Sequence, residues 1–435
     1  MSVSGILAFE AAILIGLPYL AWRYLGLRHI APLAVVQIVC GLSLGPSILG
    51  RVSPDVQLAL FGTETSPSLS GVATVAVVLF TFISGMHLDA KVFRGTSRVD
   101  LGLSLSSFLV PLLLGTALGY WLATNDPALI GPKASVWVFA VAIGICIAVT
   151  ALPVLAALLK EINIVDTALG QQALGFAAMT DGALWVSISA LLIVSAGARE
   201  DGLWHLALVP IYLIAALIVL PRLMRRAAQI REANVETGDT VLIVACTLAF
   251  TSAFASEFTG LGYVIGAFLA GTAMPSEIRA ALLRRLDWPV TLLLMPFFFM
   301  VTGLRTEADL LSVPVLGMAV AATVLAIVGK IGGVTVPAIL LGLNRRRSLA
   351  LGVLLQSKGL MEVLVVTVLI DAGIVTASVF SALILVAVFC TVLAMPLTRF
   401  IIGTGGTRVA TLGFHPLGLQ SSPAKAPMLV SKSTA

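Results

Sequence analysis

The chain has 435 residues, of which 59% are hydrophobic and only 11% are charged, and its formal net charge is +5. Soluble domains carry about 25% charged residues because most of their surface faces water, so this composition excludes an ordinary soluble protein. The long, continuous apolar runs also exclude a transmembrane β-barrel, whose strands alternate in polarity over segments of about ten residues. We therefore expect an all-α polytopic membrane protein.

Hydropathy and turn signals predict about 13 transmembrane helices, because helices satisfy every backbone polar group within the membrane. The predicted spans cover residues 5–22, 31–49, 70–88, 101–123, 135–159, 167–196, 203–221, 240–256, 260–276, 289–304, 313–342, 349–370 and 375–401.

The longest polar connection between two predicted spans follows the seventh. It divides the chain into a first half at 1–221, a cytoplasmic linker at 222–239 and a second half at 240–402. Residues 403–435 are rich in Ser, Pro and Lys, a composition typical of a disordered tail.

The Lys and Arg residues predict the orientation. Of 26 such residues, 20 fall in one set of connections and tails, whereas four fall in the other: Arg51, Lys133, Arg199 and Arg305. Because positive residues concentrate on the cytoplasmic side, we expect a plasma-membrane protein with its N-terminus outside and its C-terminus in the cytoplasm. The net positive charge is thus explained by the membrane topology. The expected partner is the lipid bilayer, and no nucleic-acid partner is expected.

Four charged residues lie well inside predicted spans: Asp181, Lys330, Lys358 and Glu362. Each such charge costs about 2.5–3.5 kcal/mol on membrane-insertion scales, so accidental placement is improbable and a functional site is the default interpretation. Lys358 and Glu362 are four residues apart, a spacing at which helical side chains pair.

Two pairs of segments resemble each other across the chain. "LFTFISGMHLDAKVF" (79–93) resembles "FFFMVTGLRTEADLL" (297–311), and "CGLSLGPSILG" (40–50) resembles "GAFLAGTAMPS" (266–276). Both pairs are displaced by seven spans. An odd displacement inverts the second copy, so the pattern predicts the two inverted repeats of secondary transporters.

The same displacement pairs span five with span twelve, and both are predicted to be discontinuous and to cross. Pro153 interrupts "IAVTALPVLAALLKE", and Ser357 with Gly359 interrupts "LLQSKGLMEVLVV". Broken helices are tolerated in a membrane where their freed backbone lines protein or a cavity. Asp181 and Lys330 lie in the adjoining spans, so charges and helix breaks are expected to converge on one site near the midplane.

The chain resembles the monovalent cation:proton antiporters, most closely the antiporter-2 branch of bacteria and plants. The resemblance rests on "GLSLGPSILG", "FTFISGMHLD", "VTALPVLAALLKE", "IGAFLAGTAMP", "FFFMVTGLRTE" and "SKGLMEV", in this order, and covers about residues 5–402. It implies a core domain with crossed broken helices that moves against a dimerisation domain, and a homodimer as the assembly.

The resemblance also implies roles for individual residues. Asp181 matches the aspartate that binds the cation and the proton in turn, and Thr180 stands where the family has Asp or Asn. Lys330 matches a core lysine that pairs with that missing acid, so here it either contacts Asp181 directly or remains partly neutral. Thr150 is a candidate oxygen ligand beside the break, although it and Ser357 could instead bond to carbonyls of their own helices.

The predicted function is therefore exchange of Na⁺ or K⁺ for H⁺ by alternating access, with no cofactor. Two alternatives stay open at this stage. One is a proton- or sodium-coupled transporter of an organic solute on the same fold, motivated by Thr180 and the intramembrane lysines; the other is a channel or sensor without exchange. No arrangement of a nucleophile, a base or metal ligands indicates an enzyme.

Overall fold

The computed structural model describes residues 3–402 except 28–32, 47, 62–65, 88–96, 163, 166, 198–202, 230–236, 260 and 305–311. The regular elements of this part of the chain are all helices, and an isolated bridge joins Ile130 and Val375. Eight of its helices are long and apolar enough to cross a membrane, and four shorter apolar helices accompany them. These findings confirm a multi-pass, all-α membrane protein, while the total of 13 spans remains a prediction.

The helices follow one another in this order: α1 (Val3–Tyr24), α2 (Leu33–Leu44), α3 (Leu49–Val52), α4 (Pro54–Leu60), α5 (Ser66–His87), α7 (Arg98–Asn125), η2 (Pro127–Leu129), α8 (Val136–Ala148), α9 (Leu152–Glu161), α10 (Ala168–Gly197), α11 (Leu203–Gln229), α12 (Thr237–Phe258), α13 (Tyr263–Thr272), α14 (Ser276–Pro289), η4 (Val290–Leu294), α15 (Met295–Leu304), α16 (Val313–Leu340), α17 (Arg345–Leu354), α18 (Leu360–Asp371) and α19 (Ala377–Ile402).

The tenth predicted span is shorter than the helix that forms there. Prediction starts it at residue 289, whereas α14 already begins at Ser276 and continues through the π-helical turn η4 into α15. The added part carries Arg279, Arg284 and Arg285. A hydropathy signal stops at such charges, but backbone hydrogen bonding along a helix does not.

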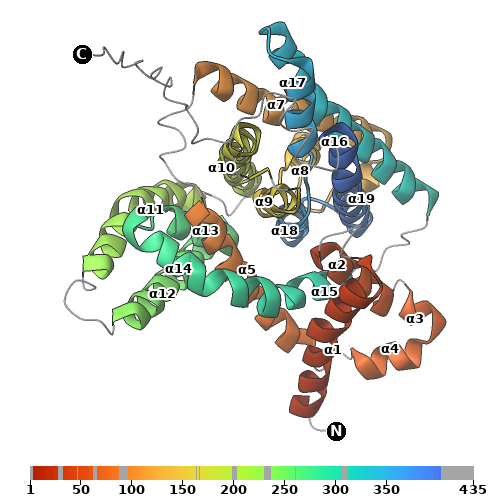
Figure 1. Ribbon diagram of the computed structural model, residues 1–435. Coiled ribbons are helices and arrows are strands. Elements are labelled where there is room, and N and C mark those ends of the chain that lie inside the picture. Colours follow the sequence, from red (N-terminus) through yellow and green to blue (C-terminus); the bar gives the residue numbers. More distant parts are fainter. Residues whose placement is uncertain are drawn as a thin grey trace, which may run out of the picture.

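Figure 1 shows the helices in two groups. We call α7–α10 with α16–α19 the core group, and α1–α5 with α11–α15 the scaffold group. Each group takes helices from both the predicted first half (1–221) and the predicted second half (240–402). The boundaries of those halves stay a prediction, and the tail at 403–435 lies outside the described residues.

Glycines allow two very close helix crossings in the scaffold group. On α5 and α13, a Cβ atom at Gly85 would lie 2.2 Å from the carbonyl oxygen of Phe268, and one at Gly271 would lie 2.1 Å from that of Phe82. On α2 and α15, a Cβ atom at Gly41 would lie 2.5 Å from the carbonyl oxygen of Met300. A displacement by seven predicted spans converts one crossing into the other, which agrees with the predicted inverted repeats; the repeats themselves stay a prediction.

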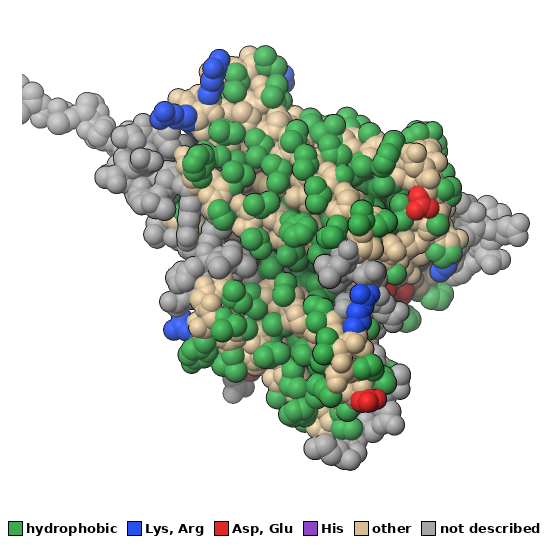
Figure 2. All heavy atoms as spheres, turned by 90° about the vertical axis from the view of Figure 1, so that its right-hand side faces the viewer, with side chains coloured by type: hydrophobic (Ala, Val, Ile, Leu, Met, Phe, Trp, Pro, Cys, Tyr) green, Lys and Arg blue, Asp and Glu red, His purple; other side chains and the backbone are tan. Residues whose placement is uncertain are grey.

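The outer surface suits lipid. Large apolar side chains are exposed on helices of both groups; Leu113 of α7 is 66% exposed and Phe254 of α12 is 72% exposed. Figure 2 shows hydrophobic side chains over most of one face of the molecule, with few charged ones among them. The charged residues inside the predicted spans are instead buried between helices.

Candidate functional site

Two broken helices meet inside the core group. The chain is not helical between Ala148 at the end of α8 and Leu152 at the start of α9, nor between the end of α17 and Leu360 at the start of α18. Each interruption hydrogen-bonds to the other: the Thr150 hydroxyl donates to the carbonyl of Leu355 at 3.1 Å, and the Ala151 amide donates to that of Ser357 at 2.8 Å. These bonds satisfy backbone groups that lipid could not.

Local sequence explains both interruptions. Pro153 is the second residue of α9, a position where the missing amide hydrogen is harmless, so the helix restarts just before it. Gly359 caps the start of α18 with φ of +145°, a conformation that favours glycine. A Cβ atom there would also lie 2.9 Å from a methyl group of Val154, which brings the second interruption close to α9.

Two buried lysines bind the carbonyl end of α8. The Lys358 Nζ donates to the carbonyl of Cys146 at 2.8 Å, and the Lys330 Nζ donates to that of Ala148 at 2.5 Å and to that of Ser107 at 3.2 Å. Carbonyls at a helix C-terminus lack helical partners and form the negative end of the helix dipole, so ammonium groups stabilise them. These bonds explain why two lysine side chains are buried at this depth.

Lys358 also forms an ion pair with Glu362. The two side chains are fully buried, and the Lys358 Nζ lies 3.2 Å from Glu362 Oε1. The pair forms although Gly359 interrupts the helix between them, because Glu362 lies in the first turn of α18, directly beyond the interruption. The pairing predicted from the four-residue spacing therefore forms across the start of α18 and not along one continuous helix.

Asp181 lies on α10, which packs against both α8 and α9. The residue is only 3% exposed. One carboxylate oxygen, Oδ2, accepts a hydrogen bond of 3.1 Å from the hydroxyl of Ser84 on α5. Among the described residues the other oxygen, Oδ1, has no hydrogen-bond partner. Because a buried carboxylate is costly without partners, Oδ1 marks a position where a proton or a cation would be favourable.

The contact at Asp181 joins the core group to the scaffold group. Asp181 belongs to α10 of the core, whereas Ser84 belongs to α5 of the scaffold, next to the close crossing at Gly85. One turn after Asp181, Trp185 stacks on Phe268 of α13 with ring centroids 5.0 Å apart. The carboxylate therefore lies at the boundary between the groups rather than deep inside one of them.

The other predicted site residues have partners of different kinds. The Thr180 hydroxyl donates to the carbonyl of Ala177 on its own helix, at 3.0 Å. Thr150 bonds across the two interruptions rather than to its own helix. The Ser357 hydroxyl is buried, with no hydrogen-bond partner among the described residues. Lys330 makes its bonds to backbone carbonyls and forms no ion pair with Asp181.

Ser84 is the residue that sequence reasoning missed. It lies 97 residues from Asp181, in the "FTFISGMHLD" segment, which drew attention for the internal repeat and the family resemblance and not as part of the site. The available signal was a hydroxyl residue in an otherwise apolar stretch beside a glycine. That signal does not reveal which distant helix the hydroxyl faces.

Comparison with known proteins adds independent findings. Residues 11–402 match the family of the sodium/hydrogen exchanger transmembrane region. Cation/H⁺ antiporter 17 of Arabidopsis thaliana is 30% identical over 376 residues, which are 84% of this chain and 45% of that protein. The Na⁺/H⁺ antiporter NhaS4 of Synechocystis is 28% identical over 387 residues, 86% of this chain and 93% of that protein.

K⁺/H⁺ antiporter 1 of Saccharomyces cerevisiae is 28% identical over 381 residues, 85% of this chain and 43% of that protein. The chain thus spans less than half the length of this relative and of the plant relative. The solved structure of the sodium proton antiporter MjNhaP1 from Methanocaldococcus jannaschii has the same fold, with a TM-score of 0.58 at 14% identity, covering 92% of this chain and 97% of that one.

Proposed function

Since the chain belongs to the sodium/hydrogen exchanger family, we propose that it is a secondary antiporter that exchanges a monovalent cation, Na⁺ or K⁺, for H⁺ across a membrane. Relatives named as antiporters of Na⁺ and of K⁺ support this proposal, and so does the shared fold. One observation of the site carries it: a buried carboxylate, Asp181, has one oxygen bonded across the boundary between the helix groups, and its other oxygen has no hydrogen-bond partner among the described residues.

The chemistry follows from the cost of a buried charge. A carboxylate in this position is stable when a proton neutralises it or when a cation binds beside it. The two ligands compete for the same oxygens, so binding of one releases the other. A carrier that changes the side of access only when Asp181 is occupied then exchanges one cation for one proton.

Oxygen atoms near Asp181 would replace part of the water shell of the cation. Candidates are the hydroxyls of Thr180 and Thr150 and the backbone carbonyls at the helix interruptions, which are the usual cation ligands of broken-helix transporters. Thr180 takes the place of the acidic residue that is common in the family. A single carboxylate therefore favours electroneutral exchange.

Lys330, Lys358 and Glu362 serve a structural role in this proposal. Both lysines bind carbonyls at the end of α8, and Lys358 is neutralised by Glu362. These bonds fix the interruptions next to α10 and leave Asp181 as the titrating group. This occupation of the lysines also weakens the case for an organic anion as substrate, which would need a free positive charge.

Alternating access is proposed as movement of the core group against the scaffold group. The bond between Ser84 and Asp181 spans that boundary, so it would break and re-form in each cycle. The proposed setting is the plasma membrane, with the N-terminus outside, the C-terminus in the cytoplasm and two copies forming a homodimer.

Reconstituted protein tests the proposal. In proteoliposomes with an imposed pH gradient, addition of Na⁺, K⁺ or Li⁺ is expected to dissipate the gradient, as followed by a pH-sensitive dye. Asp181→Asn should abolish this response. The matched control, Asp55→Asn, removes an exposed carboxylate of α4 and should leave it intact. Normal exchange by Asp181→Asn would refute the proposed mechanism, and cation flux that ignores the proton gradient would indicate a channel.

A further inference from the structure

Helix α10, which carries Asp181, bonds to two other core helices near its start. There Gln172 lies between an acid and a base. Its side-chain nitrogen Nε2 donates to Asp100 Oδ1 of α7 at 2.6 Å, and its oxygen Oε1 accepts from the guanidinium of Arg347 of α17 at 3.0 Å. All three side chains are partly buried. We call these three residues the Gln172 cluster.

The two charges determine which way the Gln172 amide faces. A carboxylate only accepts hydrogen bonds and a guanidinium only donates them, whereas an amide donates at one end and accepts at the other. With its nitrogen toward Asp100 and its oxygen toward Arg347, both contacts are attractive. The position therefore requires an uncharged side chain that both donates and accepts, and a glutamate there would face a second carboxylate.

Both charged residues are themselves fixed at helix starts. Ser97, the N-cap residue of α7, donates its hydroxyl hydrogen to Asp100 Oδ2 at 2.8 Å and accepts from the Asp100 amide at 3.0 Å. Arg347 lies in the first turn of α17, and its amide donates to Oδ1 of the N-cap residue Asn344 at 3.3 Å. The cluster thus joins α10 to the capped first turns of two neighbouring core helices.

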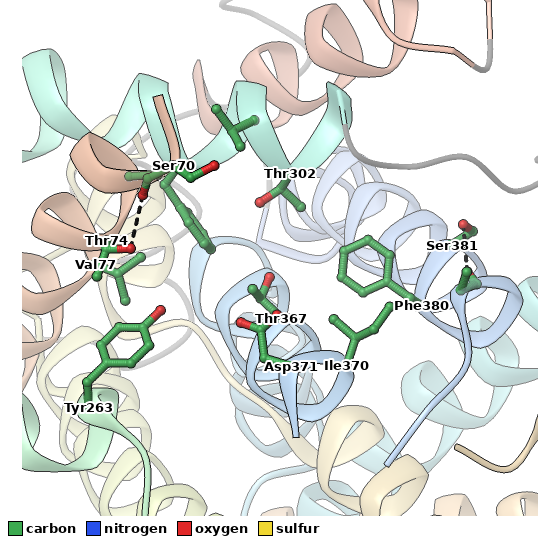
Figure 3. Close-up of a pocket in the computed structure, with 14 residues that line it drawn as sticks. Ser70, Thr74, Val77, Tyr263, Thr302, Thr367, Ile370, Asp371, Phe380 and Ser381 are labelled. Carbon is green, nitrogen blue, oxygen red and sulfur yellow. Dashed lines mark hydrogen bonds between the residues drawn. The ribbon is translucent and has the colours of Figure 1, made fainter. Parts of the chain in front are cut away.

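The middle of α10 is instead held by the scaffold group. Asp181 accepts the bond from Ser84 of α5, and Trp185 stacks on Phe268 of α13. Elsewhere along the boundary the two groups leave space between them, since a cavity of about 230 Å³ is lined by residues of α5 on one side and of α18 on the other (Figure 3). The scaffold therefore contacts the site helix itself and not only the helices around it.

Displacement of the start of α10 must also displace Asp181. The helix is continuous from Ala168 to Gly197 and contains no proline. Gln172 is nine residues before Asp181, about 14 Å along the axis at 1.5 Å per residue. When the core group moves, the scaffold contacts hold Asp181 back, whereas the Gln172 cluster carries it along with α7 and α17.

We propose that Gln172 is a positioning residue for exchange. Through its two charged partners it keeps α10 in register with α7 and α17, so that Asp181 moves with the core group when the bond to Ser84 breaks. The inference rests on the proposed antiport function. Because Gln172 lies far along the helix from the carboxylate, loss of the cluster should lower the maximal exchange rate and leave the half-saturating cation concentration nearly unchanged.

The first test changes the amide without changing its size. Gln172→Glu places a carboxylate oxygen where the amide nitrogen now lies 2.6 Å from Asp100 Oδ1, so this contact becomes repulsive. In proteoliposomes the maximal rate per folded protein should fall about five- to tenfold, with the half-saturating concentration within about twofold. The matched control is Gln171→Glu, since Gln171 is an exposed neighbour that bonds to the Val165 carbonyl outside the cluster. Its rate should be unchanged.

Asp100→Asn should rescue Gln172→Glu. The asparagine oxygen can accept from Ser97 while its nitrogen donates to the new carboxylate, which also pairs with Arg347. The order of donors and acceptors is then restored at the same net charge, so the rate should return to within about twofold of that of the unaltered chain. Failure of this rescue would overturn the inference, as would a normal rate for Gln172→Glu alone or an equal loss for Gln171→Glu.

A second combination separates positioning from a general loss of stability. If the scaffold holds α10 back once the cluster is lost, Ser84→Ala should weaken that hold. Adding Ser84→Ala to Gln172→Glu should then raise the maximal rate at least about twofold above that of Gln172→Glu alone. A general loss of stability would make the double variant as slow or slower, and that result would overturn the inference.

Hydrogen–deuterium exchange followed by mass spectrometry separates this inference from the proposed function, because it needs no transport. Gln172→Glu should speed amide exchange in peptides that cover residues 172–180 about fivefold or more, and the added change Asp100→Asn should reverse this. Unchanged amide protection in Gln172→Glu would overturn the positioning role even if cation exchange is normal. Absence of cation exchange by the unaltered chain would refute the antiport function instead.

Discussion

The buried ion pair between Lys358 and Glu362 offers a sharp quantitative test of the role assigned to the intramembrane charges. The perturbation is a double-mutant cycle of Lys358→Met, Glu362→Gln and the two changes together. If the pair is structural, each single change leaves an uncompensated group in the core, and the double change removes the whole pair.

The magnitude follows from the geometry. Both side chains are fully buried and the charged atoms are 3.2 Å apart, so loss of one partner should cost about 3–5 kcal/mol of folding free energy. Loss of both should cost far less than the sum, because no unpaired charge remains. We expect a coupling energy of at least about 2 kcal/mol, at the upper end of values measured for residues in contact.

The assay is reversible unfolding by SDS in mixed micelles, followed by tryptophan fluorescence. The control cycle is Asp239→Asn with Arg285→Gln, an ion pair whose side chains are 82% and 47% exposed and which should couple by less than about 1 kcal/mol. Additive effects at positions 358 and 362, within about 0.5 kcal/mol, would refute the structural role. Those residues would then need a part in transport.

Two further predictions concern the scaffold helices. Ser84→Ala removes the hydrogen bond to Asp181. Because hydrogen bonds to charged groups contribute about 1.5–3 kcal/mol, the half-saturating cation concentration should change about tenfold or more, and exchange should be retained. Ser187→Ala, whose hydroxyl bonds to its own helix, should change it little, and equal behaviour of both variants would contradict the assigned contact. Gly271→Ala would place a Cβ atom 2.1 Å from the Phe82 carbonyl oxygen, so it should destabilise the protein by about 1–3 kcal/mol or more in SDS unfolding. The control is Gly71→Ala, whose Cβ atom would meet no atom within 4 Å. A Gly271→Ala protein of unchanged stability would count against the crossing.

The sequence alone predicted the helical elements because those elements are specified locally. In a membrane each spanning segment must satisfy its own backbone, so an apolar run of sufficient length becomes a helix whatever surrounds it. The interruptions were predictable for the same reason: Pro153 lacks an amide hydrogen, and Gly359 can adopt a positive φ. The pairing of Lys358 with Glu362 followed from a separation of four residues.

Contacts between helices followed a different rule. Sequence spacing predicted neither the bond from Ser84 to Asp181, across 97 residues, nor the bonds from Lys330 to the carbonyls of Ser107 and Ala148, across 223 and 182 residues. The presence of a hydroxyl or an ammonium group in the sequence does not indicate which distant residue it will bond to. The partner is decided by which helix faces pack together, and in this chain glycines at the crossings determine how closely they pack.

The residue types therefore determined by themselves that the chain forms membrane helices and that two of them break, and they predicted Asp181 as a candidate cation site. Tertiary structure decided that one oxygen of Asp181 meets Ser84 while the other has no hydrogen-bond partner among the described residues, and that the lysines bind the end of α8. The physical reason is range: backbone hydrogen bonding and helix breaking act within about one helical turn, whereas a binding site forms only where segments far apart in the chain are packed together.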